Sequence, residues 1–176
     1  MPKQKTIDLA IPRSYYSLSP RAFVESFLAV FCVATIPLLF AHHPQNQFVV
    51  GPIVNTILFL TCLRLGIMNA LFIAIIPSMA ALFGGMLPPQ AITILPFIVL
   101  GNFAMLISFF FLKTNPYGKV FLSSLLKAAV VFSPLLVGVK VPAVLVFMLS
   151  WPQFLTALLG GFIAVKINNF LKVRQR

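Results

Sequence analysis

Residues 48–87 read FVVGPIVNTILFLTCLRLGIMNALFIAIIPSMAALFGGML, and Arg64 is the only charged residue among them. A transmembrane helix needs about 20 apolar residues, within a range of roughly 17 to 25. The stretch is long enough for two such helices, over residues 48–65 and 67–87, with a tight turn at Gly66 between them. The sequence therefore predicts a helical hairpin inside a bilayer, and Arg64 places its turn on the cytoplasmic side.

Four further spans follow from the same criterion, so we expect an all-α integral membrane protein with six transmembrane helices. The other four spans are residues 22–41, 91–112, 120–137 and 151–170. The chain then consists of a cytoplasmic N-terminal tail (1–21), a six-helix transmembrane domain (22–170) and a basic cytoplasmic C-terminal tail (171–176). The composition agrees, because 9% of the residues are charged, against roughly a quarter in soluble domains.

The last apolar stretch, residues 141–165, is longer than one span and is interrupted by Pro142 and Pro152. The run Ser150-Trp151-Pro152-Gln153 matches a capping box, with Ser150 as the N-cap residue and Gln153 at position N3. We therefore expect the sixth span to begin at Trp151. Residues 141–149 are then too short to span, and we expect a short helix or a re-entrant segment on the outer face.

The basic residues are distributed asymmetrically along this topology. The chain has 13 Lys and Arg, 2 Asp and Glu, and a formal net charge of +11. All of the Lys and Arg except Lys140 fit the inner side or the membrane interior. Cytoplasmic segments retain Lys and Arg, so both termini are predicted to face the cytoplasm. Because the charge adjoins apolar spans, anionic lipid headgroups are its expected partner and nucleic acid is not.

Few residues suit catalysis. Asp8 and Glu25 are the only carboxylates, which nearly excludes a mechanism that needs paired carboxylates or a carboxylate-bound metal. We expect Glu25 to pair with Arg21, one helical turn before it. No G-x-x-x-x-G-K-[ST] run occurs, so the chain has no ATPase site of its own, and no cofactor or metal is expected. His42 and His43 leave three alternatives open: a polar turn, a weak metal site, or the base of a membrane enzyme.

Lys127 lies well inside the fifth predicted span, where an ionisable side chain indicates a functional site. The alternative is that its long stem lets the ammonium reach the cytoplasmic headgroups. Asn102 in the fourth span lies at a matched depth, since both are about 15 to 17 Å from the outer surface at 1.5 Å per residue. Together they suit a ligand with a carboxylate or a carbonyl group. Asn102 alternatively makes an interhelical hydrogen bond.

Three residues nearer the outer surface complete the predicted site. Asn55 and Gln153 are candidates for hydrogen bonds to a ligand, and Trp151 is either a stacking ring or an interfacial belt residue. Elsewhere, Ala70 and Ala74 in the third span are spaced by four residues. Small residues at this spacing let two helices approach closely, within the bundle or against another protein.

Four segments carry a further resemblance. They are Gly51-Pro52-Ile53-Val54-Asn55, Leu65-Gly66, Gly85-Met86-Leu87-Pro88-Pro89 and Trp151-Pro152-Gln153. Together with six short spans and inner termini, they resemble the substrate-binding S components of energy-coupling factor (ECF) transporters, roughly over residues 22–170. The resemblance implies a multi-pass protein of the prokaryotic plasma membrane, in which spans four to six and the outer loops hold a vitamin, a metal or a similar micronutrient.

The resemblance also implies partners. Spans one to three would face a transmembrane T component coupled to two cytoplasmic ATPases, with Ala29, Ala70 and Ala74 as candidate contacts. Nickel and cobalt binders of the family begin with Met-His, whereas residue 2 here is Pro, so a metal substrate is less expected. The leading hypothesis is binding and translocation of a vitamin-like organic solute. The alternative is a structural membrane subunit of a cell-shape or redox complex, which would bind no ligand.

Overall fold

The computed structural model describes residues 20–40, 46–84, 89–139 and 142–174. Within these ranges the chain is all-helical, with 91% of the residues in helices and no strand. The helices are α1 (Pro20–Leu39), α2 (Asn46–Leu65), α3 (Ile67–Phe83), the 3-10 helix η1 (Pro89–Ile94), α4 (Leu95–Phe111), α5 (Pro116–Leu136), α6 (Ala143–Leu149) and α7 (Trp151–Arg174). The expected all-α class is confirmed for this part of the chain.

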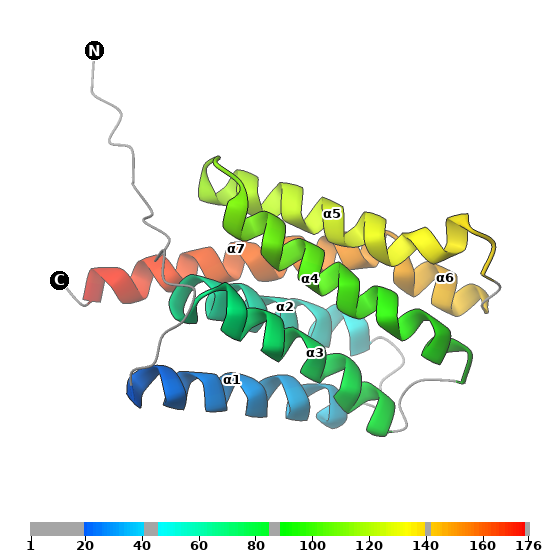
Figure 1. Cartoon of the computed structure of the whole chain (residues 1–176), viewed down its shortest axis with the longest axis horizontal. Coiled ribbons are helices and arrows are strands. Elements are labelled where there is room, and N and C mark those ends of the chain that lie inside the picture. Colours follow the sequence, from blue (N-terminus) through cyan, green and yellow to red (C-terminus); the bar gives the residue numbers. More distant parts are fainter. Residues whose placement is uncertain (1–19, 41–45, 85–88, 140–141, 175–176) are drawn as a thin grey trace, which may run out of the picture.

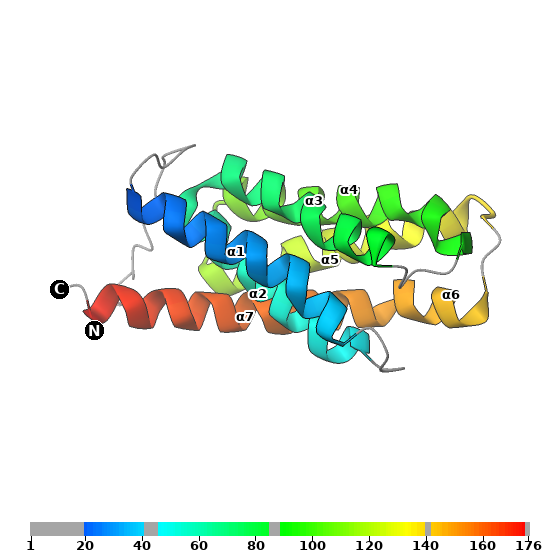
Figure 2. The same ribbon diagram turned by 90° about the horizontal axis from the view of Figure 1, so that it is seen from below.

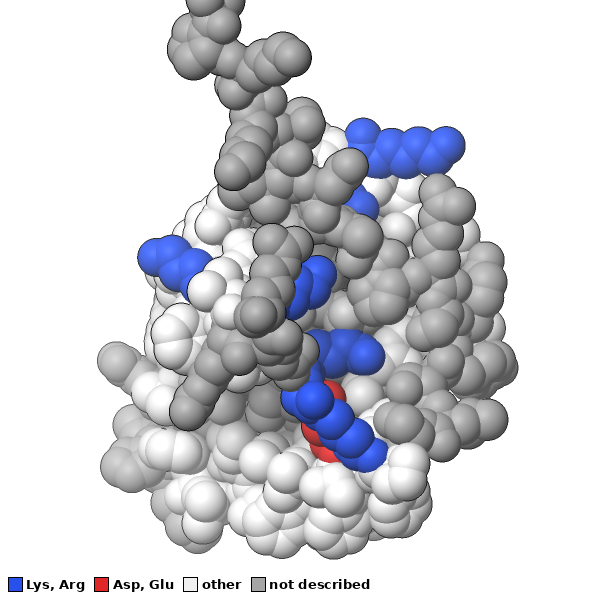
Figure 3. All heavy atoms as spheres, turned by 90° about the vertical axis from the view of Figure 1, so that its left-hand side faces the viewer, with Lys and Arg blue, Asp and Glu red and all other residues white. Residues whose placement is uncertain are grey.

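The six long helices, α1 to α5 and α7, run back and forth along one axis (Figure 1). Successive long helices point in opposite directions, so α1 begins and α7 ends at the same end of the bundle. We call this the basic end, because every described basic side chain except Lys127 lies toward it, and Figure 3 shows Lys and Arg gathered there. These residues are Arg21, Arg64, Lys113, Lys119, Lys166 and Lys172. Helix α6 lies at the opposite end and continues the line of α7 (Figure 2).

Within the described ranges, five helical segments are long and apolar enough to cross a membrane. They are Pro20–Leu39, Gln47–Leu65, Ile92–Phe111, Pro116–Leu136 and Ala143–Val173. Many large apolar side chains on their outer faces are exposed, for example Phe23 and Phe27 of α1. Such faces suit lipid and not water, so the chain has the character of a helical membrane protein.

The third predicted span, residues 67–87, forms a shorter helix than expected. Helix α3 has 17 residues and ends at Phe83, because Gly84 turns the chain and donates its N–H to the carbonyl of Ala80. The remainder of that predicted span, from residue 85 onward, lies outside the described residues. Helix α3 is therefore shorter than each of the five segments that are long enough to cross a membrane.

Prolines and caps decide where α4 and α5 begin. The predicted span 91–112 starts as η1 and becomes α-helical at Leu95, with Pro96 in the first turn, where a missing N–H costs least. Helix α5 begins four residues before the predicted span 120–137. The reason is Asn115, whose side-chain oxygen accepts a 2.7 Å hydrogen bond from the Gly118 N–H and caps the helix.

The last span begins at Trp151 as predicted, but the capping box is wrong. The Ser150 hydroxyl donates to the Phe147 carbonyl at 2.6 Å, and the Gln153 side chain donates to the Met148 carbonyl at 3.3 Å. Both side chains therefore satisfy carbonyl groups at the end of α6 instead of N–H groups at the start of α7. The expected short segment before it is helix α6, and α7 includes residues 171–174 of the predicted C-terminal tail.

Helix α2 is central, since it packs against α1, α3 and, most extensively, α7. The α2 and α7 backbones touch at Gly160, where a Cβ atom would lie 2.7 Å from the Pro52 carbonyl oxygen and 2.7 Å from the Asn55 Cβ. Only glycine allows this approach. The contact fixes the position of Asn55 relative to α7.

Ala70 and Ala74 pack inside the bundle. Both are 0% exposed and belong to the main apolar core, so they offer no surface to a partner helix. Of the two alternatives for this small-residue spacing, close packing within the chain is the one found, and the expected partner contact at these two residues is wrong. Ala29 on α1 is half-buried against the same core.

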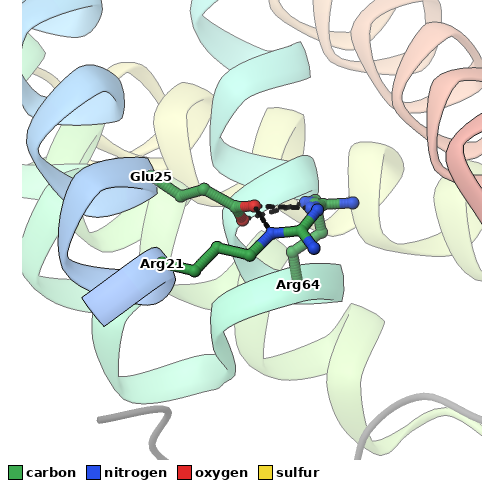
Figure 4. A network of polar contacts seen from close by, with 3 residues as sticks. All are labelled: Arg21, Glu25 and Arg64. Atoms are coloured by element: carbon green, nitrogen blue, oxygen red, sulfur yellow. Dashed lines mark hydrogen bonds and ion pairs between the residues drawn. The ribbon is translucent and has the colours of Figure 1, made fainter. Parts of the chain in front are cut away.

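An ion-pair network joins α1 to α2 near the basic end (Figure 4). Arg21 donates to Glu25 at 3.0 Å, which confirms the expected pair one helical turn apart. The sequence did not reveal that Arg64, at the end of α2, also donates to both Glu25 oxygens, at 2.5 and 3.0 Å. Glu25 thus serves as the shared acceptor of two guanidinium groups.

Candidate binding site

A cavity of about 270 Å³ lies in the half of the bundle away from the basic end. Its walls come from the last part of α1 and α3, the first part of α2, α4 and α7, the middle of α5, and α6. These parts meet because the long helices alternate in direction (Figure 1). The volume is close to the lower limit of ~300 Å³ for small-molecule sites in proteins.

Lys127 lines this cavity from the middle of α5 and is 5% exposed. Its Nζ donates a 2.7 Å hydrogen bond to the Oδ1 atom of Asn55, which is also buried. Each residue is about nine positions from the end of its helix that lies opposite the basic end, or roughly 14 Å at 1.5 Å per residue. The structure therefore shows the ammonium held at mid-helix and not reaching toward the basic end.

Asn102 lies on α4 beside the same cavity and is 3% exposed. Its Nδ2 donates to the Ala74 carbonyl of α3 at 3.3 Å, so the interhelical hydrogen bond considered from the sequence is present. Its Oδ1 is buried and has no hydrogen-bond partner among the described residues. The residue thus ties two helices together and keeps one free acceptor.

Two glutamines connect α6 to the rest of the bundle. The Gln47 side chain on α2 donates to the Met148 carbonyl at 2.7 Å, and the Gln153 side chain on α7 donates to the same oxygen at 3.3 Å. The last carbonyls of a helix have no partner within the helix, so this oxygen is free to accept from both. The two amides thereby hold the end of α6 against the cavity, which Met148 itself lines.

The remaining wall of the cavity is mainly apolar. Ser78 and Thr156 add hydroxyl groups, and neither Asp nor Glu lines the cavity within the part of the chain that the structure describes. The apolar lining residues are Pro37, Val50, Val54, Pro77, Ala81, Ile94, Leu95, Ile98, Leu145, Met148 and Leu149. An occupant would therefore meet one cation, several amides and a largely apolar wall.

Four of the five predicted ligand contacts meet at this cavity, namely Asn55, Asn102, Lys127 and Gln153. Trp151 is not among the lining residues. It is 52% exposed, and its ring contacts Phe147 and Phe48, with centroid distances of 5.5 and 6.0 Å. That position resembles the interfacial alternative considered for it.

Sequence reasoning missed part of the wall. The predicted second span begins at residue 48 and so leaves out Gln47, which lies in the first turn of α2. Ser78 gave no signal within an apolar span. The cavity also extends beyond the predicted spans four to six, since α1, α2 and α3 contribute to it. His42, His43 and Lys140 lie outside the described residues.

No family model, curated protein or solved structure matches the chain.

Proposed function

We propose that this chain is a membrane-embedded binding protein for a small organic solute that carries a carboxylate or carbonyl group. The observation that carries the proposal is the Lys127 ammonium, which Asn55 holds at 2.7 Å on the wall of a cavity of about 270 Å³. A buried ionisable side chain inside a membrane span is costly, and such residues typically mark a substrate or ion path. A packing role alone would be met by an apolar side chain of the same length.

The proposed topology has six spans with the basic end in the cytoplasm. Helix α3, with 17 residues, is about 26 Å long at 1.5 Å per residue, close to the ~30 Å hydrocarbon core, and we assign it as a span in addition to the five longer segments. The excess of Lys and Arg at the basic end then follows the positive-inside rule for a prokaryotic plasma membrane. The cavity, at the opposite end, faces the outside of the cell.

In its full form, the proposal makes the chain the S component of an ECF-type transporter for a vitamin-like micronutrient. This part is supported by the four sequence segments that resemble S components. It is also supported by the six long helices, because an even number of helices leaves both ends of the bundle on one side. Because the sequence has no ATP-binding run, transport would depend on a T component and two ATPases. With Ala70 and Ala74 buried, the proposed contact with the T component rests on the exposed face of α1 next to Ala29.

Binding is tested by native mass spectrometry of the protein extracted from its own cells into nanodiscs. We expect a retained small molecule, and we expect Lys127→Met to abolish its retention. Lys166→Met is the matched control, because Lys166 is exposed on α7 and outside the cavity. Equal retention by the parent protein and the Lys127→Met variant would refute the role of the ammonium.

Partners are tested by co-purification under mild detergent. Recovery of a membrane subunit with two ATPases supports the transporter. Recovery of cytoskeletal or electron-transfer proteins, together with an empty cavity, supports a structural subunit instead. The two outcomes separate the partner question from the binding question.

A further inference from the structure

With its amine protonated, Lys127 gives the cavity an unbalanced positive charge. Lys127 is the only ionisable residue that lines it among the described residues, and its hydrogen-bond partner Asn55 is neutral. Of the two carboxylates in the chain, Glu25 is bound to two arginines near the basic end, and Asp8 lies outside the described residues. A buried cation is stable only with a counter-charge or full hydrogen bonding, and an ammonium has three N–H donors. Asn55 accepts one of them, so an anionic ligand would supply what is missing.

Besides an anionic group for Lys127, the ligand needs a group that suits Asn102. Its amide orientation is fixed, because Nδ2 donates to the Ala74 carbonyl and the opposite orientation would bring two oxygens together. The atom left without a partner is therefore Oδ1, an acceptor that is buried beside the cavity. Burying an acceptor without a donor is costly, so the ligand that fits best carries an N–H or O–H group.

The acceptor and the ammonium belong to neighbouring turns of two tightly packed helices. A Cβ atom on Gly101, the residue next to Asn102, would lie 3.3 Å from the Lys127 carbonyl oxygen and 3.5 Å from its Cγ. Both residues also line the same cavity, so the proposal places one ligand against both. The apolar wall and the volume of about 270 Å³ leave room for a compact apolar body and provide no partner for a second charge.

We infer that the cavity selects a small organic monoanion. Its carboxylate would bind Lys127, its N–H or O–H donor would bind Asn102, and its apolar ring or chain would pack between α6 and α4. This inference rests on the proposed solute binding and narrows its ligand from carboxylate or carbonyl compounds to carboxylates with a donor. It excludes amines, polyphosphates and neutral amides as preferred ligands.

The test is a binding panel of matched probes against the full-length protein in nanodiscs, measured by isothermal titration. Indole-3-acetate, indole-3-acetamide and tryptamine share one ring and differ in charge. Benzofuran-3-acetate keeps the shape and the carboxylate of indole-3-acetate but lacks the N–H donor. A second set, 4-hydroxyphenylacetate, its amide, tyramine and 4-methylphenylacetate, repeats the comparison on a smaller ring.

We expect the carboxylate with a donor to bind at least about tenfold more tightly than its amide or amine, because a hydrogen bond to a charged group contributes a factor of this order. The carboxylate that lacks a donor should bind about five to ten times more weakly than the carboxylate that has one. Preference for the amine or the amide would refute the monoanion while leaving solute binding intact. If no probe binds and no molecule is retained from cells, solute binding fails as well.

A charge variant tests the same inference from the protein side. Asn55→Asp would place a carboxylate beside the Lys127 ammonium, so the internal ion pair would replace the anionic ligand. We expect carboxylate binding to fall at least about tenfold without loss of thermal stability. Asn115→Asp is the matched control, since the Asn115 side-chain oxygen caps α5 by accepting from the Gly118 N–H, a role that a carboxylate keeps, and Asn115 does not line the cavity. Unchanged affinity in Asn55→Asp would overturn the inference.

Discussion

The Nζ atom of Lys127 on α5 donates a 2.7 Å hydrogen bond to Oδ1 of Asn55 on α2, 72 positions earlier in the chain. Both side chains are buried, and Glu25, the one carboxylate side chain among the described residues, is paired with Arg21 and Arg64 and does not line the cavity. The pair joins two helices at mid-span and also exposes the ammonium to the cavity. Substitutions can therefore separate the contribution of the pair to folding stability from its contribution to ligand binding.

Asn55→Leu should destabilise the protein by about 3 kcal/mol, because it leaves a buried ammonium without its acceptor. Lys127→Met removes the charge together with its need for a partner, so its effect on stability should be small or favourable. The double variant should then be more stable than Asn55→Leu alone. Thermal unfolding of the three variants in one detergent provides the double-mutant cycle. Additive effects would show that the hydrogen bond contributes nothing to folding.

Glu25→Gln should destabilise the half of the bundle nearer the basic end by about 1 to 3 kcal/mol. The Arg64 guanidinium, whose side chain is 21% exposed, loses its carboxylate partner in this variant. Arg21→Gln is the matched control and should change stability little, because the Arg21 side chain is 65% exposed and solvent screens its ion pair. Chemical unfolding in nanodiscs measures both, and equal effects would show that Arg21 and not Arg64 is the important partner.

Gly160→Ala should destabilise the protein, although alanine forms helices better than glycine by about 1 kcal/mol. The added Cβ atom would lie 2.7 Å from the Pro52 carbonyl oxygen and would force α2 away from α7. It would also disturb the 3.1 Å hydrogen bond from the Thr56 hydroxyl to the Gly160 carbonyl. We expect a loss of about 1 to 3 kcal/mol in thermal unfolding.

The control for that substitution is Leu159→Ala, one position earlier on the same helix. Leu159 is 52% exposed toward lipid, so its truncation creates no internal cavity and should change stability by less than about 1 kcal/mol. A Gly160→Ala protein as stable as the parent would show that the two helices can separate at no cost.

The local features of this fold were predictable because they depend on neighbouring residues. The Arg21–Glu25 pair, the start of α7 at Trp151 and the unusual depth of Lys127 all follow from spacing along one helix. The predicted span 67–87 extends beyond the end of α3 at Phe83, although the glycines at 84 and 85 already indicate a break in the helix. Local patterns set the depth of a residue in a span but leave its partner open.

The long-range pairs were not predictable for that reason. Arg64 meets Glu25 across 39 positions, and Asn55 meets Lys127 across 72, only because α1, α2 and α5 take a particular order and rotation in the bundle. The acceptor for Gln47 and Gln153 is a main-chain carbonyl, and such groups carry no signal in the sequence. The capping box failed at the same place, because Ser150 and Gln153 bond to α6 instead.

The hydrogen bonds from Gln47 and Gln153 to the Met148 carbonyl predict that α6 restricts access to the cavity. Gln47→Leu combined with Gln153→Leu leaves the Met148 carbonyl without its side-chain donors, so α6 should move away from the cavity more often. Access is measured on Ser78→Cys in a Cys32→Ala background, because Ser78 is 5% exposed and lines the cavity while Cys62 is 0% exposed. We expect a membrane-impermeant methanethiosulfonate to modify this cysteine about tenfold faster when both glutamines are replaced.

The fluorescence of Trp151, the single tryptophan, should change in parallel, since its ring contacts Phe147 on α6. Asn69→Leu in the same background should leave both signals unaltered, and an unchanged modification rate in the double glutamine variant would show that α6 does not control access to the cavity.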